Sequence, residues 1–176
     1  MTKNTFDHSR RNFILGQSAQ KSPPPIRPPW SYNEQLFLEC CSQCQKCLEA
    51  CPGKILTKGE GGFPAVDFLQ GECTFCEACL KVCDDGALMQ LNHQPPWYLK
   101  ASIQSECLTF KGINCQTCID MCGTQALTSL FNSQGISSPQ INSDLCTGCG
   151  ACFQVCPSGS IEMISLQPDE TIHEQN

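Results

Sequence analysis

Apolar residues in this chain occur in short clusters, separated by turn-forming residues and by runs of cysteine. Residues 87–91 and 161–164 are apolar clusters of strand-forming length, and they predict two short β-strands. Two further segments, 63–67 and 138–142, contain a proline and are expected to form short strands that lead into cysteine runs. Short helices are expected near the last cysteine of each run. The pattern therefore predicts a small α+β fold.

Composition limits how such a fold can be stabilised. Of the 176 residues, 17 are cysteine, and only 40% of the chain is hydrophobic, so one large apolar core is not expected. Small units bury too little surface to be stable alone, and metal ligation then supplies folding free energy. We therefore expect a metal-stabilised fold whose apoprotein is largely disordered. No apolar run approaches the roughly 20 residues that span a bilayer, so no transmembrane segment is predicted.

One cysteine run indicates which metal is bound. Residues 146–157 read C-x2-C-x2-C-x3-C-P, the bacterial ferredoxin pattern that holds a 4Fe-4S cluster. Three thiolates spaced by two residues can bind three corners of a cubane, and Gly148 and Gly150 allow the backbone to approach the sulfides closely. In two-cluster ferredoxins the fourth cysteine binds the neighbouring cluster. The run therefore predicts a partner run in the same domain.

Three further runs repeat this pattern. Two keep every spacing, whereas the third has Gly112 in place of its first cysteine and a cysteine five residues earlier. The ligands predicted from the three regular runs are Cys41, Cys44, Cys47, Cys51, Cys73, Cys76, Cys79, Cys83, Cys146, Cys149, Cys152 and Cys156. Those predicted from the modified run are Cys107, Cys115, Cys118 and Cys122. The chain is thus expected to bind three 4Fe-4S clusters, and a fourth at the modified run.

Two other uses of cysteine fit the sequence less well. Disulfide frameworks are typical of short secreted chains with a signal peptide and an even number of cysteines, and none of these conditions holds. Structural zinc needs two separated cysteine pairs, not three cysteines spaced by two residues and followed by a fourth. An oxygen-sensitive metal held by free thiolates indicates a reducing compartment, the bacterial or archaeal cytoplasm. Cys40 is predicted not to be a ligand, although the sequence also permits a register that uses Cys40 instead of Cys41.

Repeated landmarks predict two tandem ferredoxin-type units. A Pro-Pro-Trp sequence precedes the first and third runs at nearly the same distance, and a proline-containing strand precedes the second and fourth. These landmarks pair the first run with the second, in a unit at 30–92, and the third with the fourth, in a unit at 94–166. Spacing alone would also permit the second and third runs to pair.

This pairing also predicts which fourth cysteines change sites. Cys51 and Cys83 are expected to exchange between the two clusters of the first unit, and Cys122 and Cys156 between those of the second. Each run is therefore not the complete ligand set of one cluster.

The ends of the chain are predicted to be tails. Residues 1–29 form a flexible, disordered tail that ends in a proline-rich linker. Trp30, directly after this linker, is expected to pack against the body. Residues 167–176 form a second tail. Arg10 and Arg11 resemble the start of a twin-arginine export signal. Export also needs an apolar stretch of roughly 7 to 15 residues after the charged part, and polar residues follow here instead. We therefore predict that the protein is not exported by its own signal.

The net charge indicates what kind of partner to expect. The chain has a formal charge of -6, and clusters bound by thiolates add further negative charge. No basic stripe with interleaved aromatic residues occurs, which argues against nucleic acid as a partner. A protein with a basic patch is the expected partner.

Several of these features together resemble the NapF family, ferredoxin-type accessory proteins of periplasmic nitrate reductase systems. They are Ser9-Arg10-Arg11, Arg27-Pro28-Pro29-Trp30, Gly61-Gly62-Phe63-Pro64, Cys73-Thr-Phe-Cys76, the stretched Cys107 to Cys122 run and the closing Cys146 run. The resemblance covers nearly the whole chain. It implies a cytoplasmic, non-catalytic iron-sulfur protein that contacts the precursor of the nitrate reductase catalytic subunit and assists the maturation of its iron-sulfur centre before export.

Under this interpretation Arg10 and Arg11 are candidate partner-binding residues. Two alternatives stay open: a soluble electron carrier, and an electron-transfer subunit of a larger oxidoreductase. Ligand spacing cannot separate the three, because it fixes the cofactor and not the electron donor or acceptor.

Overall fold

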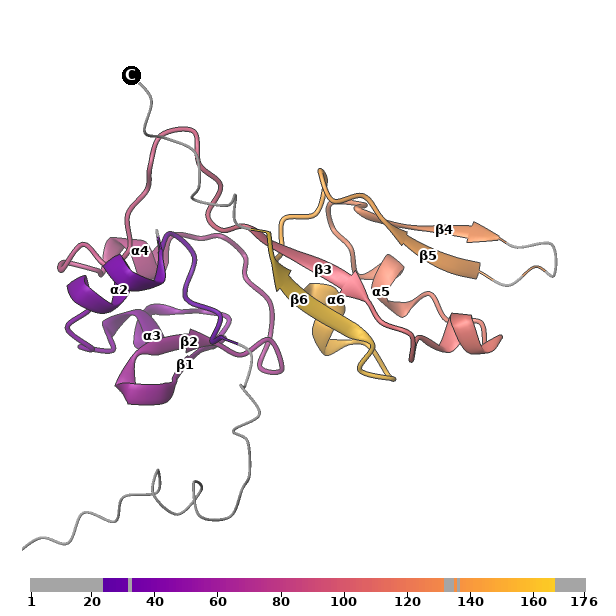
Figure 1. Cartoon of the computed structure of the whole chain (residues 1–176), viewed down its shortest axis with the longest axis horizontal. Coiled ribbons are helices and arrows are strands. Elements are labelled where there is room, and N and C mark those ends of the chain that lie inside the picture. The colour runs from indigo at the N-terminus through magenta and orange to yellow at the C-terminus, as the bar shows by residue number, and fades with distance from the viewer. Residues whose placement is uncertain (1–23, 32, 132–134, 136, 167–176) are drawn as a thin grey trace, which may run out of the picture.

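The structure is a computed structural model that describes residues 24–31, 33–131, 135 and 137–166. Its short helices and strands fall into two groups that lie end to end (Figure 1). The first group consists of α2 (Glu34–Cys40), α3 (Lys46–Ala50), β1 (Leu56–Lys58), the 3-10 helix η1 (Glu60–Gly62), β2 (Pro64–Val66) and α4 (Ala78–Lys81). The second consists of β3 (Leu99–Ile103), the 3-10 helix η2 (Leu108–Lys111), α5 (Thr117–Asp120), β4 (Leu127–Phe131), β5 (Ser137–Ile141), α6 (Ala151–Gln154) and β6 (Ile161–Ser165).

The strands of the described residues form three two-stranded antiparallel sheets. β1 pairs with β2 and β4 pairs with β5, so both pairs join strands that are neighbours in sequence. β3 and β6 are far apart in sequence, yet they pair with Leu99 opposite Ser165. β2, β5 and β6 confirm the strands predicted at 63–67, 138–142 and 161–164.

The strand predicted at 87–91 was wrong, because this segment has no partner strand. The corresponding segment of the second group is β6. β6 pairs with β3, and β3 follows Trp97 as α2 follows Trp30. After Trp30 the chain forms helix α2 instead, whose first turn is capped by the side chain of Asn33. The prolines before Trp30 lack amide donors and cannot replace the missing strand. The segment keeps a hydrogen bond from the Met89 amide to the Trp30 carbonyl, at 2.9 Å.

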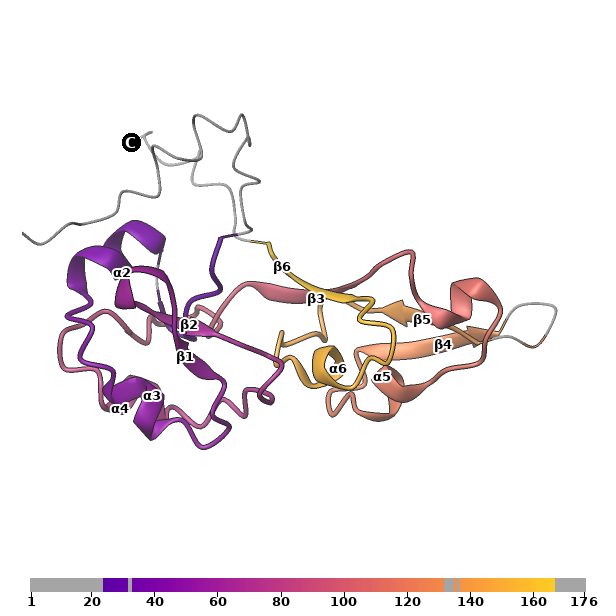
Figure 2. The same ribbon diagram turned by 90° about the horizontal axis from the view of Figure 1, so that it is seen from below.

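A short helix contains the third cysteine of every run and ends one or two residues before the fourth, as the sequence predicted. α3, α4, α5 and α6 each begin one residue before the third cysteine of their run. α3 packs against α4, and α5 packs against α6 (Figure 2). These contacts bring the first run next to the second and the third next to the fourth, which is the pairing that the repeated landmarks favour.

The segment before α2 belongs to the first unit and not to a tail. Pro28 and Pro29 are fully buried, and Trp30, as predicted, packs into the core with 8% of its surface exposed. The Val66 amide of β2 donates a hydrogen bond to the Ile26 carbonyl at 2.8 Å. The predicted end of the N-terminal tail was therefore placed too late, since a small core recruits these large apolar side chains.

Cysteine takes part in the core of both units. In the first unit Cys47 and Cys79 are buried together with Phe37, Ile55 and other apolar residues. In the second unit Cys152 is buried among Ala101, Leu127 and Ile161, and further cysteines pack around both cores. Thiols thus occupy places that aliphatic side chains fill in most small domains. Across the part of the chain that the structure describes, no helix is long and apolar enough to cross a membrane.

Candidate iron-sulfur centres

Three cavities are each lined by four cysteines, and in each cavity one of the four comes from the partner run. We number the sites by the run that supplies three cysteines. The first site is lined by Cys41, Cys44, Cys47 and Cys83. The second is lined by Cys73, Cys76, Cys79 and Cys51, and the fourth by Cys146, Cys149, Cys152 and Cys122. This grouping is the one expected when the fourth cysteines of paired runs exchange.

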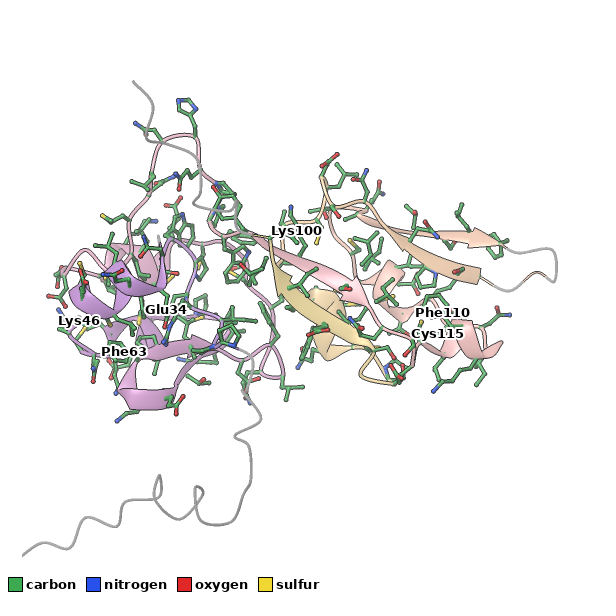
Figure 3. All side chains as sticks on the ribbon, viewed as in Figure 1. Glu34, Lys46, Phe63, Lys100, Phe110 and Cys115 are labelled. Atoms are coloured by element: carbon green, nitrogen blue, oxygen red, sulfur yellow. The ribbon has the colours of Figure 1, made fainter. Side chains whose placement is uncertain are left out.

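The modified run contributes to a comparable third site. The Cys118 thiol lies close enough to Cys107, Cys115 and Cys156 to be influenced electrostatically by all three. The residues inserted before Cys115 fold back as η2, in the segment that the labels of Phe110 and Cys115 mark in Figure 3. Gly112, which follows η2, has a φ of +80°. This compact turn lets Cys107 take the place of the missing first cysteine although it stands earlier in the sequence.

The loops that carry the cysteines turn through left-handed residues. Gln45 in the first run and Gly150 in the fourth have φ values of +64° and +86°, and each directly precedes the helix of its run. The glycines of the fourth run were expected to let the loop approach the sulfides. The structure adds another reason, since a Cβ at Gly150 would collide with the Phe68 ring and one at Gly148 with the Leu99 carbonyl. Both glycines are thus required by contacts within the protein.

The third cysteine of each run lies in an apolar environment. Burial, reinforced by neighbouring thiols, raises the pKa of Cys47 and Cys118 to about 11. The same causes raise the pKa of Cys79 and Cys152 to about 12. These thiols are protonated at neutral pH, so iron must displace their protons when it binds.

The exchanged cysteines of the second unit behave in the opposite way. Burial raises the pKa of Cys156, but hydrogen bonds from Ser158 and Ser160 outweigh it, and the pKa is lowered. The Ser160 amide lies 3.2 Å from the Cys156 sulfur. At Cys122 burial is likewise outweighed by hydrogen bonds, chiefly from the Leu127 amide, and the pKa is again lowered. These donors favour the thiolate form.

Three of the four cysteine groups line a cavity. The three cavities each contain 340 to 350 Å³ of empty space, counting the part that opens to solvent. Tetrahedral zinc, with Zn–S bonds of about 2.3 Å, requires side chains that converge on one point. Among the described residues, no three His, Cys, Asp or Glu side chains converge closely enough to hold one metal ion. A cubane binds each thiolate at a different corner and so accepts a wider spacing. When bound, such a cluster supplies one-electron redox chemistry.

Cys40 and Asp84, which the sequence also singled out, both lie near the first site. Cys41 lines the first site, whereas the half-buried Cys40 does not line that cavity. Asp84, which stands where the motif has proline, forms an exposed ion pair with Lys46 at 2.7 Å and so links the second run to the first. Arg10 and Arg11 lie outside the described residues.

Sequence reasoning missed the side chains that join the two units. Phe68 is 3% exposed and lies between Trp97 and Phe153, with ring centroids 5.8 and 6.1 Å away. An isolated phenylalanine gives no motif, and only the repeated Pro-Pro-Trp sequence singled out Trp97.

Comparison with known proteins identifies the family. Models of the 4Fe-4S dicluster domain match residues 40–88 and 111–160. The ferredoxin-type protein NapF of Escherichia coli is 41% identical over 156 residues, which are 89% of this chain and 94% of that protein. This chain belongs to the NapF family of ferredoxin-type proteins. NapF of Haemophilus influenzae is 42% identical over 145 residues, 82% of each chain. The ferredoxin-type protein NapG of Escherichia coli is 31% identical over 181 residues, which cover 89% of this chain and 78% of NapG.

These matches confirm the NapF resemblance and the two tandem dicluster units expected from the sequence. The first match spans both regular runs of the first unit. The second begins at residue 111, so it leaves Cys107 outside. The early cysteine of this NapF-family chain is therefore a departure from the general dicluster pattern.

Proposed function

We propose that this protein binds four 4Fe-4S clusters, one in each of the four sites. The observation that carries the proposal is the convergence of three cysteines from one run with the fourth cysteine of its partner run. At the third site Cys107, Cys115, Cys118 and Cys156 are the ligands, and Cys40 is not a ligand. The first unit then extends from about residue 26 to 92, and the second from 94 to 166. Iron and acid-labile sulfide analysis under anaerobic conditions tests the count, with about four of each expected per cluster.

We further propose that the protein acts in the cytoplasm on the precursor of the nitrate reductase catalytic subunit. Its role there is to assist assembly of the iron-sulfur centre of that subunit before export, without being an enzyme itself. The support is the membership of the NapF family together with the acidic charge of -6. Such a charge favours encounter with a basic patch on the client through electrostatic steering.

An electron carrier, either soluble or as a subunit of a larger oxidoreductase, is the second candidate. The exposed Cys44 and Cys76 favour it, because they place the edges of the first and second sites at the surface, within reach of a redox partner. A carrier needs brief encounters and rapid release, whereas an assembly factor must hold its client.

Anaerobic affinity purification from cells that respire nitrate separates these functions. An assembly factor is expected to retain the precursor and not the mature enzyme. Replacing Arg10 and Arg11 by Gln should weaken that complex, whereas replacing the exposed Lys54 and Lys58 by Gln removes the same charge and should not. Equal recovery of precursor and mature enzyme, or a deletion strain with fully assembled nitrate reductase that cannot be reduced, would favour the electron carrier.

A further inference from the structure

The two units meet through ligand loops of two cluster sites. The Cys73 amide, at the start of the second run, donates a hydrogen bond of 2.8 Å to the carbonyl of Cys149, in the middle of the fourth run. Among the described residues, no other backbone hydrogen bond joins a candidate ligand of one unit to a candidate ligand of the other. The second and fourth sites are therefore the inner pair of sites.

Aromatic side chains hold these two loops together. The buried Phe68 packs edge-on against Trp97 and at a tilt against Phe153 of α6. Trp97 also packs edge-on against Phe75 of the second run, with ring centroids 5.7 Å apart. Its indole nitrogen donates to the Thr147 carbonyl of the fourth run at 2.8 Å. Trp97 thus contacts both ligand loops at once.

The fit between the units leaves little room for change. Gly150 of the fourth run lies directly against the Phe68 ring, where no Cβ could be accommodated. Beside it, the Gln154 side-chain amide donates to the Leu69 carbonyl at 3.2 Å. The contact is therefore specific to the residues that surround the second and fourth sites, and it fixes their relative position.

We propose that Phe68, Trp97 and the hydrogen bond between Cys73 and Cys149 position the second and fourth sites side by side, so that an electron passes between the units at this point. In that exchange a cluster held at one inner site would lose the electron that a cluster at the other gains. The exchanged cysteines connect the outer sites to the inner ones. The order of sites is then first, second, fourth and third, which differs from their order in the sequence. This inference rests on the proposed binding of four clusters.

Electron paramagnetic resonance of the fully reduced protein tests this order, because a nearby second paramagnet speeds the relaxation of a cluster. Cys76→Ser removes a ligand of the second site, and Cys44→Ser removes the matching ligand of the first. The signal of the fourth-site cluster is expected to relax more slowly in Cys76→Ser than in Cys44→Ser, while the third-site cluster, which both variants keep, contributes equally in both. Equal relaxation of that signal in the two variants would overturn the proposed order.

A second pair of variants tests the positioning role while leaving every ligand in place. Phe68→Ala should weaken the same magnetic interaction with unchanged iron content. Phe63→Ala removes a phenylalanine of the first unit that packs on Phe37 away from the contact, and it should leave the interaction unchanged. Should Phe68→Ala lose iron, the two cysteine variants decide. A wild-type protein without iron in an inner site would instead refute the binding of four clusters, which iron analysis distinguishes from the failure of the proposed order.

Discussion

Replacing Arg27 by Ala should loosen the N-terminal segment from the first unit. The Arg27 side chain is 10% exposed. Its Nε and Nη2 donate to the Glu34 carboxylate at 2.8 and 2.6 Å, and its Nη1 donates to the Pro64 carbonyl at 3.0 Å. The guanidinium also lies over the rings of Phe37 and Phe63, with its carbon 5.1 and 5.7 Å from their centroids. One side chain thus joins the segment before α2 to helix α2 and to strand β2.

These contacts set the expected size of the effect. A hydrogen bond from a charged donor contributes about 1.5 to 3 kcal/mol, and each cation–π contact contributes about 0.5 to 1 kcal/mol. The pair with the half-exposed Glu34 adds at most about 1 kcal/mol. These contributions come from one guanidinium and are not additive, and the segment can partly fill the space that alanine leaves. We therefore expect a loss smaller than their sum, about 2 kcal/mol in local stability, which corresponds to about a 30-fold change in the opening equilibrium.

Hydrogen exchange followed by mass spectrometry under anaerobic conditions measures this opening directly. The Val66 amide is the reporter, since it donates to the Ile26 carbonyl, and its protection should fall by about 30-fold in Arg27→Ala. Arg27→Lys keeps the charge but not the planar fork, so it should give an intermediate loss. Lys46→Ala serves as control, because its ion pair with Asp84 is exposed on both sides.

If Val66 exchanged as slowly in Arg27→Ala as in the wild type, at equal iron content, the prolines and Trp30 would hold the segment without help from Arg27. If Lys46→Ala produced the same loss, the effect would reflect net charge and not the geometry of the Arg27 site.

Three further predictions concern the cluster sites. Cys83 lines the first site, so Cys83→Ser should remove the first cluster and about four irons per chain. Iron analysis and paramagnetic resonance would show this loss, and loss of the second cluster alone would contradict the exchange of fourth cysteines. Cluster uptake by the apoprotein at pH 7 should release protons, because a cysteine thiol is protonated there in the unfolded chain, with a pKa of about 8.5, and burial raises the pKa of Cys47 and Cys79 further in the folded one. Uptake should therefore weaken as the pH falls, and a pH-stat trace without proton release would contradict this. Gly112→Ala, at a φ of +80°, should destabilise the loop of the third site by about 1 to 2 kcal/mol and hasten its loss of iron to a chelator. Gly123→Ala, at an open position without positive φ, is the control and should lose iron at the wild-type rate.

Local spacing explains why much of this molecule could be predicted. The intervals of two and three residues between cysteines decide which thiols can meet around one cluster, and they leave room for one short helix before the fourth cysteine. The repeated Pro-Pro-Trp sequence and the proline-containing strands were enough to pair the runs. β2 and β5 were also predictable, because each contains a proline and leads into a run, and β6 was predictable as a short apolar cluster after the last run.

The misplaced features all depend on partners that are distant in sequence. A strand at 87–91 needs a second strand beside it, and the Asn33 cap turns the segment that could have provided one into helix α2. Likewise, the segment before α2 has the sequence of a linker. The hydrogen bond from the Val66 amide of β2 to the Ile26 carbonyl, which attaches this segment to the first unit, joins residues far apart in the chain.

The cofactor class, the candidate ligands and the NapF family could be predicted from the residues alone, because these depend on residue types at short, fixed intervals. The way in which the two units meet could not be predicted and follows from the folded structure. The Phe68 ring, the Trp97 indole and the bond between Cys73 and Cys149 come from segments far apart in the chain. Their contact depends on shape and burial after both units have folded, and no local interval in the sequence encodes it.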